Sequence, residues 1–408
     1  MRIFVSAGEP SGDHHGADLI EAIRRRMPDT EFVGFGGDRM KAAGATLLFP
    51  LVDLAMMWFT RVLLNLRKFF RLLDQADASF RDQRPDAVVL IDYPGFHWHV
   101  ARKAKARGIP VIYYVPPQIW AWAGWRIKKV KRSVDQVLCS LPFEPAWYAE
   151  HGFSNAEYVG HPFFDELGER PVDQAFLDAE RSRATPLVVI LPGSRTQEVS
   201  QNLPILLRAA AQLASGGRDV RFAVACLHER HQSLAESILT SEGLTDLPLV
   251  FHAAKTPELI RVAKLAWAVS GSVSLELMME ALPTVVLYKV KRFGMFLAYL
   301  FKKAKYITLV NLLADAEVMP EYLTRFDVSS DLANWGAKWL DDPTERAKAS
   351  QALAELREKV AQPGASERAA ERILATIAGA SKPHVYAGPR ARASSILSIN
   401  EDTGASRS

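Results

Sequence analysis

The sequence contains little cysteine, with Cys139 and Cys226 the only two in 408 residues. Two cysteines exclude a disulfide framework and a cysteine-based zinc site by count alone. Each lies in an apolar run with the composition of a β-strand, so we expect both to be small buried side chains.

Long apolar segments are also absent. The longest stretch without a charged residue, 108–125, contains the pair Pro116-Pro117 and is poor material for a membrane-spanning helix. The N-terminus runs directly into the strand-like segment 2–6, without the apolar region and cleavage site of a secretory signal. These features predict residence in the cytoplasm.

Strong charge of one sign and metal-ligand patterns are missing as well. The net charge is only +4, and no known nucleic-acid-binding module occurs, so we expect no nucleic-acid partner. The sequence has no Asp-x-Asp pair, and His228 and His231 miss the spacing of a zinc helix. An Asp-x-Asp pair would supply the oxygen ligands of a divalent cation that bridges to phosphates. Since the pair is absent, we expect no metal, and we expect no other cofactor.

What the chain does contain is an alternation of short apolar runs and helical patterns. The runs are rich in Val, Ile, Phe and Tyr, which is typical of parallel strands buried on both faces. The chain is also too long for one ordinary core. We therefore predict an α/β protein of two Rossmann-like lobes facing a central cleft. The expected strands are 2–7, 31–35, 87–91, 110–115, 134–139, 156–159, 187–191, 221–226, 249–251, 265–270 and 284–290, and the expected helices include 15–27, 97–107, 201–215, 230–242, 343–361 and 366–379.

A break in this pattern at about residues 163–185 divides the chain. We expect an N-terminal lobe over 1–165, a C-terminal lobe over 166–340 and helices that close the fold over 341–379. The remaining segment, 380–408, is rich in Ser, Ala, Gly and Arg and has no periodicity, so we predict a disordered tail.

Two turns of the first lobe carry carboxylates. The turn after the first strand contains Gly8, Glu9 and Asp13, whose charges favour hydrogen bonds to a sugar or an acceptor over a phosphate. Asp92 ends the strand 87–91, where a carboxylate facing the cleft could act as a general base toward a hydroxyl. The structural alternatives are a helix cap for Asp13 and a turn residue for Asp92.

Two turns of the second lobe favour an anion. Residues 191–199 form a strand, a Gly-Ser turn and a helix start, and Arg195 in that turn is suited to a diphosphate. Residues 269–276 again place Gly and hydroxyl groups between a strand and a helix, where Glu276 could bind a ribose or simply complement the helix dipole. Together they favour a nucleotide, and the expected contacts are Gly193, Ser194, Arg195, Glu198, Gly271, Ser272 and Glu276.

Three segments combine aromatic residues with cations: 56–71, 120–132 and 289–303. Basic amphipathic helices with Trp and Phe can lie in a lipid interface. Each segment alone also fits an ordinary helix with a solvated basic face. Three of them in a nearly neutral chain favour a membrane surface or a lipid-like acceptor.

In their order and spacing, these motifs closely resemble lipid-A-disaccharide synthases, inverting glycosyltransferases of the two-lobed GT-B type. The resemblance covers Met1 to about Ala378. His97 departs from the family pattern, because many members have Asn at that position. The resemblance rests on Ala-Gly-Glu-Pro-Ser-Gly-Asp (7–13), Ile-Asp-Tyr-Pro-Gly-Phe (91–96), Ile-Trp-Ala-Trp (119–122), Leu-Pro-Phe-Glu (141–144), Gly-His-Pro (160–162), Leu-Pro-Gly-Ser-Arg-Thr-Gln-Glu-Val (191–199), Ser-Gly-Ser-Val-Ser-Leu-Glu (270–276) and Asn-Leu-Leu-Ala (311–314).

The resemblance implies a metal-free transfer of 2,3-diacylglucosamine from its UDP derivative onto 2,3-diacylglucosamine 1-phosphate. The bond formed is β-1,6 and UDP is released. It also implies peripheral contact with the cytoplasmic face of the inner membrane, and family members can form homodimers. The implied roles are base for Asp92, contact near the reacting sugar for Glu9 and Asp13, diphosphate binding for Arg195, ribose binding for Glu276, a position near the nucleotide for Asn311, and acceptor or membrane contact for Trp58, Phe59, Trp120 and Trp122.

Three other functions stay open from the residues. The first is a glycosyltransferase of the same type with a different lipid acceptor. The second is another UDP-sugar enzyme such as an epimerase, which the aromatic and basic segments disfavour because a soluble sugar needs no lipid-facing surface. The third is a binding protein that has lost catalysis, which the presence of Asp92 and Arg195 disfavours.

Overall fold

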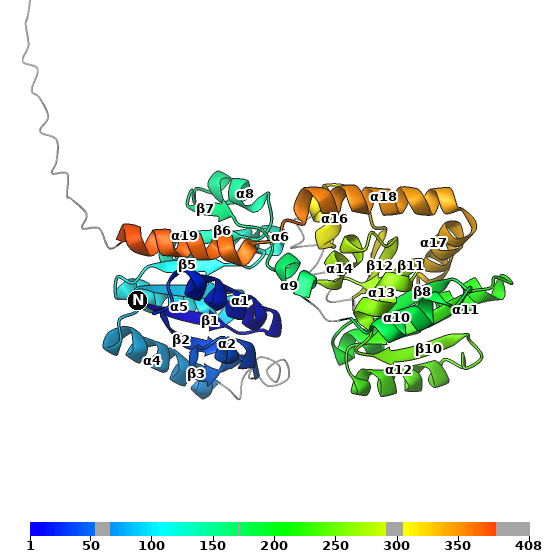
Figure 1. The fold of residues 1–408 in the computed structure, drawn as a ribbon, viewed down its shortest axis with the longest axis horizontal. Helices are drawn as coiled ribbons and strands as arrows, with labels where there is room; N and C mark the ends of the chain where they lie inside the picture. The colour runs from blue at the N-terminus through cyan, green and yellow to red at the C-terminus, as the bar shows by residue number, and fades with distance from the viewer. Residues whose placement is uncertain (54–65, 170–171, 291–304, 381–408) are drawn as a thin grey trace, which may run out of the picture.

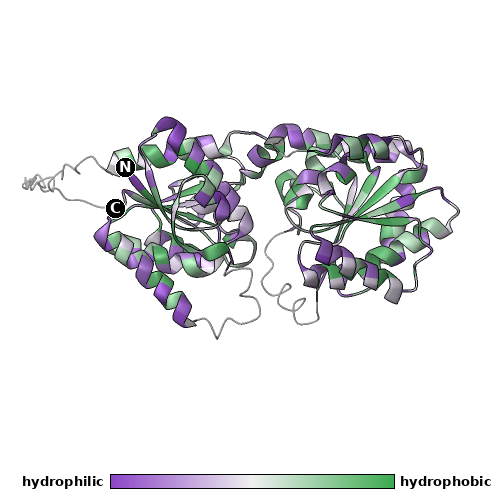
Figure 2. Cartoon of the chain, turned by 60° about the horizontal axis from the view of Figure 1, so that its bottom comes forward, coloured by the Kyte–Doolittle hydropathy of each residue, from purple (hydrophilic) through white to green (hydrophobic). Residues whose placement is uncertain are grey.

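The computed structural model describes residues 1–53, 66–169, 172–290 and 305–380. It contains two α/β lobes, each built on one parallel sheet (Figure 1). Apolar residues concentrate on the strands of both sheets (Figure 2). This arrangement follows from the sequence, since continuous apolar runs are stable as strands only when both faces of the sheet are covered.

The first sheet has seven strands in the order β3-β2-β1-β4-β5-β6-β7. Successive residues of β1 alternate between two core clusters, with Phe4 in one and Ile3 and Val5 in the other. Its strands are β1 (Arg2–Ala7), β2 (Glu31–Gly36), β3 (Thr46–Pro50), β4 (Ala87–Ile91), β5 (Val111–Tyr114), β6 (Gln136–Cys139) and β7 (Ala156–Tyr158). Its helices include α1 (Pro10–Arg26), α2 (Asp38–Ala42), α4 (Leu66–Asp82), α5 (Pro94–Ala106), α6 (Ile119–Trp122), the 3₁₀ turn η2 (Gly124–Arg126), α7 (Ile127–Ser133) and α8 (Glu144–Glu150).

The second sheet has six strands in the order β10-β9-β8-β11-β12-β13. Here Val188 and Ile190 of β8 join one core cluster, and Val189 and Leu191 join the other. Its strands are β8 (Leu187–Leu191), β9 (Arg221–Cys226), β10 (Leu249–Ala253), β11 (Leu265–Val269), β12 (Thr284–Lys289) and β13 (Glu321–Thr324). Its helices include α10 (Gln174–Arg181), α11 (Thr196–Ser215), α12 (Glu229–Ser241), α13 (Thr256–Val262), α14 (Val273–Met279), α16 (Leu309–Ala314), α17 (Ser329–Asp341) and α18 (Pro343–Val360).

Each sheet has one point where the strand order reverses direction. In the first sheet it lies between β1 and β4, and in the second between β8 and β11. At such a switch point the loops at the carboxyl ends of the two strands leave in opposite directions and open a crevice, which is where ligands bind in parallel sheets.

Two helices join the lobes. Helix α9 (Phe163–Glu169) lies between them in Figure 1; its Phe163 and Phe164 belong to the second-lobe core, whereas its Glu166 contacts His14 of α1 at 2.9 Å. Helix α19 (Ala365–Ala380) follows α18 but packs on α1, and its apolar side chains belong to the first-lobe core. The N-terminal lobe is therefore built from two segments of the chain, a return that the periodicity of the sequence does not predict.

The α/β class and every expected strand are confirmed. The sequence pattern misses β3 and β13, because both are short edge strands with half-exposed residues and lack a continuous buried apolar run. It also misses α17. The expected tail from residue 381 onward lies outside the described residues. Within the described ranges, no helix is long and apolar enough to cross a bilayer.

Asp165 holds the two joining segments together. Its carboxylate accepts hydrogen bonds from the backbone N–H groups of Gly364, Ala365 and Ser366 at 2.5, 3.3 and 3.0 Å, which caps the start of α19 from α9. We expect Asp165→Ala to lower the free energy of unfolding by roughly 2 kcal/mol, because N-cap loss leaves helix N–H groups unpaired. Urea denaturation measures the change.

Asp342→Ala is the matched control for this prediction. Asp342 caps α18 through Thr344 and Glu345, but it lies on an exposed surface of one lobe. Its loss should cost roughly 1 kcal/mol. If Asp165→Ala costs no more than this control, the cap does not fasten the lobes.

Candidate functional site

Some of the residues singled out by sequence lie at the two switch points. Glu9 follows β1 and Asp92 follows β4, and these strands pair with Ala7 opposite Ile91. Two residues that are far apart in the sequence are therefore neighbours at the carboxyl edge of the first sheet.

Asp92 has the electrostatics of a proton acceptor. Burial raises the pKa of its carboxyl group from the ordinary 3.8 to about 6, the charge of Glu9 adds to this rise, and a hydrogen bond from the Tyr93 N–H opposes it. A carboxylate with this pKa is ionised at neutral pH yet binds a proton more strongly than an ordinary aspartate.

The backbone that presents Asp92 has an unusual conformation. Asp92 and Tyr93 both have positive φ, 50° and 46°, which non-glycine residues rarely adopt. The Tyr93 ring lies across the turn after β1, where a Cβ atom on Gly8 would come within 2.3 Å of it. Gly8 is thus required for the close approach of the turns that carry Glu9 and Asp92.

At the second switch point, the turn after β8 presents Arg195. Gly193 has φ +117°, and a Cβ atom there would collide with Glu198. The Glu198 carboxylate accepts hydrogen bonds from the Ser194 and Arg195 backbone N–H groups and lies 3.2 Å from the Arg195 guanidinium. Glu198 therefore shapes the turn and orients Arg195, whose side chain is about two-thirds exposed at 65%.

The turn after β11 lies beside the Arg195 turn. Ala268 of β11 pairs with Leu191 of β8, so Gly271 and Ser272 follow at the same sheet edge as Arg195, and both are exposed. Glu276 is half-buried one turn into α14. The second switch point thus combines a guanidinium with two exposed turns at one sheet edge.

Asp13 does not join this site. Its carboxylate is buried and accepts hydrogen bonds from the N–H groups of Gly37, Arg39 and Met40 at 2.7, 3.1 and 3.2 Å. Asp13 lies within α1 and caps the start of α2, not the start of its own helix as the structural alternative expected, and these hydrogen bonds do not support the expected catalytic position.

Asn311 is also structural. Its amide group donates to the Met319 carbonyl and the Glu321 carboxylate, and its carbonyl oxygen accepts from the N–H groups of Val318 and Met319. These bonds use every donor and acceptor of the side chain, which is fully buried. Asn311 therefore fixes the segment before β13 and has no side-chain capacity left for a nucleotide contact, while its expected position near the nucleotide stays a prediction.

Of the expected lipid-side residues, the structure describes the side chain of Trp120. It is 7% exposed, its ring N–H donates to the buried Glu144 at 3.0 Å, and its ring packs edge-on against Phe143. Trp120 therefore fixes α6 from within and does not form an exposed anchor. Trp58 and Phe59, and the side chain of Trp122, lie outside what the structure describes.

Three buried residues beneath Asp92 escape sequence reasoning. His97, Tyr113 and Ser6 surround the Asp92 turn, and none belongs to a pattern that marks a site. The available signal was Pro94, which starts a helix immediately after the carboxylate and indicates a constrained turn.

The described residues contain no group of three or more His, Cys, Asp and Glu side chains that could hold a metal. Two hollows on the surface, one between α4 and α5 and one at the β9–β10 edge, lie away from both switch points. The positive charge available to an anion at the second switch point therefore includes the Arg195 guanidinium and the N-terminus of the long helix α11.

Comparison with known proteins places this geometry in context. The family model described as lipid-A-disaccharide synthetase matches residues 3–377. The lipid-A-disaccharide synthase of Myxococcus xanthus is 35% identical over 374 residues, which is 91% of this chain and 97% of that protein. Among solved structures, the HepE protein of Anabaena in complex with UDP and glucose has a TM-score of 0.57 at 15% identity, covering 92% of this chain and all of that one. A UDP-N-acetylglucosamine 2-epimerase has a TM-score of 0.62 at 12% identity, covering 93% and 97%. The two structural likenesses show the shared GT-B-like fold.

The raised pKa of Asp92 has a consequence for stability. Above pH 6 the folded chain holds an ionised carboxylate at a site where burial penalises the charge relative to the unfolded chain, so replacement by neutral Asn should stabilise the fold by up to about 3 kcal/mol. Between pH 6 and 4 this gain should shrink, because the folded-state carboxyl becomes protonated. Urea unfolding of Asp92→Asn across this range measures it.

Glu9→Gln is the control, since it removes the neighbouring charge and leaves the Asp92 carboxyl in place. It should recover only part of the gain. A stability difference for Asp92→Asn that does not vary with pH would contradict the electrostatic origin.

Proposed function

The chain belongs to the lipid-A-disaccharide synthetase family and is a glycosyltransferase of lipid A synthesis, and we propose that its two switch points hold the two substrates of this reaction. The second lobe binds UDP-2,3-diacylglucosamine through the turns after β8 and β11. The first lobe presents 2,3-diacylglucosamine 1-phosphate beside Asp92. The product is the β-1,6-linked disaccharide, and UDP is released.

Asp92 acts as the general base of the transfer. The acceptor 6-hydroxyl oxygen forms a bond to the anomeric carbon of the donor while the bond from that carbon to the diphosphate breaks. The hydroxyl proton passes to Asp92, and the electron pair of the broken bond leaves with UDP. The observation that carries this assignment is the carboxyl group at the first switch point with a pKa of about 6, which suits a base that works near neutral pH.

Arg195 stabilises the departing diphosphate. Its guanidinium is already oriented by Glu198, and the planar N–H fork of a guanidinium matches the oxygens of a phosphate. The N-terminus of α11 adds a positive potential at the same turn. This is electrostatic stabilisation of charge that develops as the bond breaks. Gly193, Ser194, Gly271 and Ser272 supply close backbone approach, and Glu276 contacts the ribose.

The proposed roles predict a separation between binding and chemistry. Incubation with the UDP-sugar and the acceptor should yield a disaccharide by mass spectrometry. Asp92→Asn should lose roughly a hundredfold or more in turnover, on the scale of general-base catalysis, and retain its UDP affinity. Arg195→Ala should weaken UDP binding roughly tenfold in calorimetry, the loss expected for one charge-assisted hydrogen bond.

Controls make this test specific. Arg325→Ala removes an exposed cation that lies over the Phe326 ring in the second lobe, and it should leave both measurements unchanged. Turnover should persist in a chelator, because no metal takes part. Wild-type-like turnover of Asp92→Asn would refute the base, and conversion of the UDP-sugar to an epimer without acceptor would favour the epimerase alternative.

Contact with a membrane is the second part of the proposal. Helix α4 packs on α5, and α5 packs on α7, so these elements form one side of the first lobe. Two large aromatic side chains stand out on it, Phe70 at 58% and Trp125 at 60% exposed. Arg126 and Lys129 lie over the Trp125 ring. Exposed aromatic side chains among cations are typical of a lipid-interface surface.

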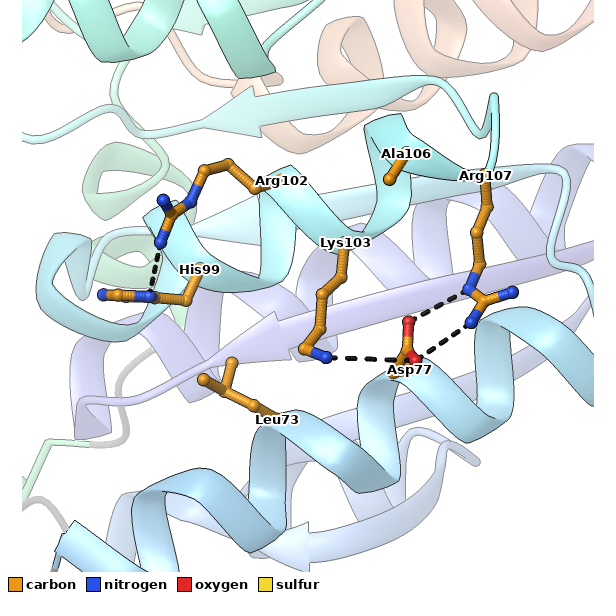
Figure 3. A pocket seen from close by; sticks show the side chains of 7 residues that line it. All are labelled: Leu73, Asp77, His99, Arg102, Lys103, Ala106 and Arg107. Carbon is orange, nitrogen blue, oxygen red and sulfur yellow. Dashed lines mark hydrogen bonds and ion pairs between the residues drawn. The ribbon is translucent and has the colours of Figure 1, made fainter.

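Figure 3 shows the groove on this side, between α4 and α5. Lys103 and Arg107 point toward Asp77 of α4, which ties Arg107 with two hydrogen bonds, whereas Arg102 turns toward His99 of α5. Their positive charge attracts anionic lipid head groups to the same lobe that holds the lipid acceptor. The hollow has a volume of about 560 Å³ and is lined by Leu73, Asp77, His99, Arg102, Lys103, Ala106 and Arg107.

This surface predicts binding to anionic vesicles. Wild-type protein should sediment with vesicles that contain phosphatidylglycerol more than with phosphatidylcholine alone. The double variant Trp125→Ser, Lys129→Glu should reduce that binding roughly tenfold, because it removes an apolar contact and reverses one charge. The matched control Phe326→Ser, Arg325→Glu alters an exposed aromatic–cation pair on the other lobe and should bind normally. Equal losses in both variants would contradict a defined membrane face.

A further inference from the structure

The backbone of the Asp92 turn is strained and needs surrounding contacts to keep its conformation. Asp92 and Tyr93 both have left-handed backbone conformations, which are strained for non-glycine residues and persist only where surrounding contacts impose them. Tyr93 is also the residue before Pro94, which starts α5. The turn therefore carries strain at the point where the proposed base is presented.

Two buried side chains form hydrogen bonds to the same backbone atom of this turn. The Asp92 carbonyl oxygen accepts a hydrogen bond from the Tyr113 hydroxyl at 2.6 Å and lies 2.7 Å from Nδ1 of His97. Both side chains are buried, Tyr113 at 1% and His97 at 0% exposed. A carbonyl oxygen has two lone pairs, and these two contacts use both.

The contacts of His97 determine where its proton resides. Burial lowers the pKa of His97 to about 4, so the ring is neutral at physiological pH. A neutral ring has one N–H, and only a donor can satisfy the Asp92 carbonyl, so Nδ1 carries the proton. Nε2 then accepts a hydrogen bond from the Ser6 hydroxyl, 2.8 Å away and fully buried.

His97 thereby connects the two strands of the first switch point. Ser6 lies in β1, three residues before Glu9, and the Asp92 turn follows β4. The Tyr93 ring lies against Gly8, so it is a second contact between the same two segments. One neutral ring thus bridges the segments that present the two carboxylates of the site.

We propose that His97 is a positioning residue for the glycosyl transfer: as the Nδ1–H tautomer bridging Ser6 and the Asp92 carbonyl, it holds the left-handed turn that aims the Asp92 carboxylate at the acceptor hydroxyl. This inference rests on the proposed role of Asp92 as base. His97 touches neither substrate and acts through the backbone of Asp92. Its loss therefore changes turnover and leaves donor binding unchanged.

Two substitutions separate the two hydrogen bonds of the ring. The amide nitrogen of Asn occupies the place of Nδ1, so His97→Asn can still donate to the Asp92 carbonyl. The longer Gln side chain reaches the place of Nε2, so His97→Gln can still bond to Ser6 but loses the contact with Asp92. Both replace the buried ring with a smaller polar group, and each controls for the space that the other leaves.

The expected result is a difference in kcat. His97→Asn should stay within about threefold of the wild type, and His97→Gln should lose roughly ten- to a hundredfold, the range for a reacting group misplaced by a fraction of an ångström to one ångström. KM for the UDP-sugar should not change in either variant. The acid limb of the kcat profile, set by Asp92 beside Glu9, Tyr93 and Tyr113, should shift in His97→Gln alone. Equal kcat values for the two variants would overturn the proposal.

A spectroscopic measurement keeps this proposal separate from the proposed function. In ¹⁵N NMR spectra the wild-type His97 should appear as the Nδ1–H tautomer, and ¹³C spectra should show the Asp92 carboxyl titrating differently in His97→Gln. An Nε2–H tautomer would refute the positioning role even in an active enzyme. Absence of disaccharide synthesis with both spectroscopic results intact would refute the function and leave the structural bridge standing.

Discussion

The parallel direction of the strands is the constraint on which the rest of this structure depends. Because all strands of a sheet run the same way, their carboxyl ends share one edge, and the reversal of strand order opens a crevice there. Glu9 and Asp92 become neighbours through the pairing of β1 with β4, and the Arg195 and Gly271 turns through the pairing of β8 with β11. Helices α9 and α19 then connect the lobes, with Asp165 fastening one to the other.

The first switch point stores free energy that folding alone would avoid. It holds a carboxylate beside Glu9 with limited access to water, and it bends two successive residues into left-handed conformations. Both features oppose stability, and both serve a base: the first strengthens its affinity for a proton, and the second aims it. The neutral His97 ring and Tyr113 offset the strain without adding a charge that would lower the pKa of Asp92 again.

Much of the fold could be predicted from the sequence, because buried parallel strands leave continuous apolar runs that are visible without any partner. The edge strands β3 and β13 were not predicted: β3 is an apolar run of only Leu47-Leu48-Phe49 next to Pro50, and β13 has four residues, none of them fully buried. Nor was the return of α19 to the first lobe, which depends on contacts with α1 that no local pattern encodes. For the site, the turns were predictable from their positions after strands, whereas the His97 bridge depends on side chains that meet only after β1, β4 and β5 have paired.

Because such contacts are visible only in the fold, sequence motifs overstate the number of residues that take part in binding or catalysis. Asp13, Glu198 and Asn311 lie in motifs of the resembling family, yet backbone N–H groups occupy their oxygens. Glu144 is likewise held by Trp120 and two N–H groups. A short polar side chain in a turn can satisfy backbone groups that a tight bend leaves unpaired, and such a bend is what brings Asp92 and Arg195 to the sheet edge. Polar residues that shape a turn and polar residues that react therefore occur in the same segments. The two kinds differ in one respect: the hydrogen-bonding capacity of a turn-shaping residue is already used within the fold. That difference is a property of the structure and not of the motif.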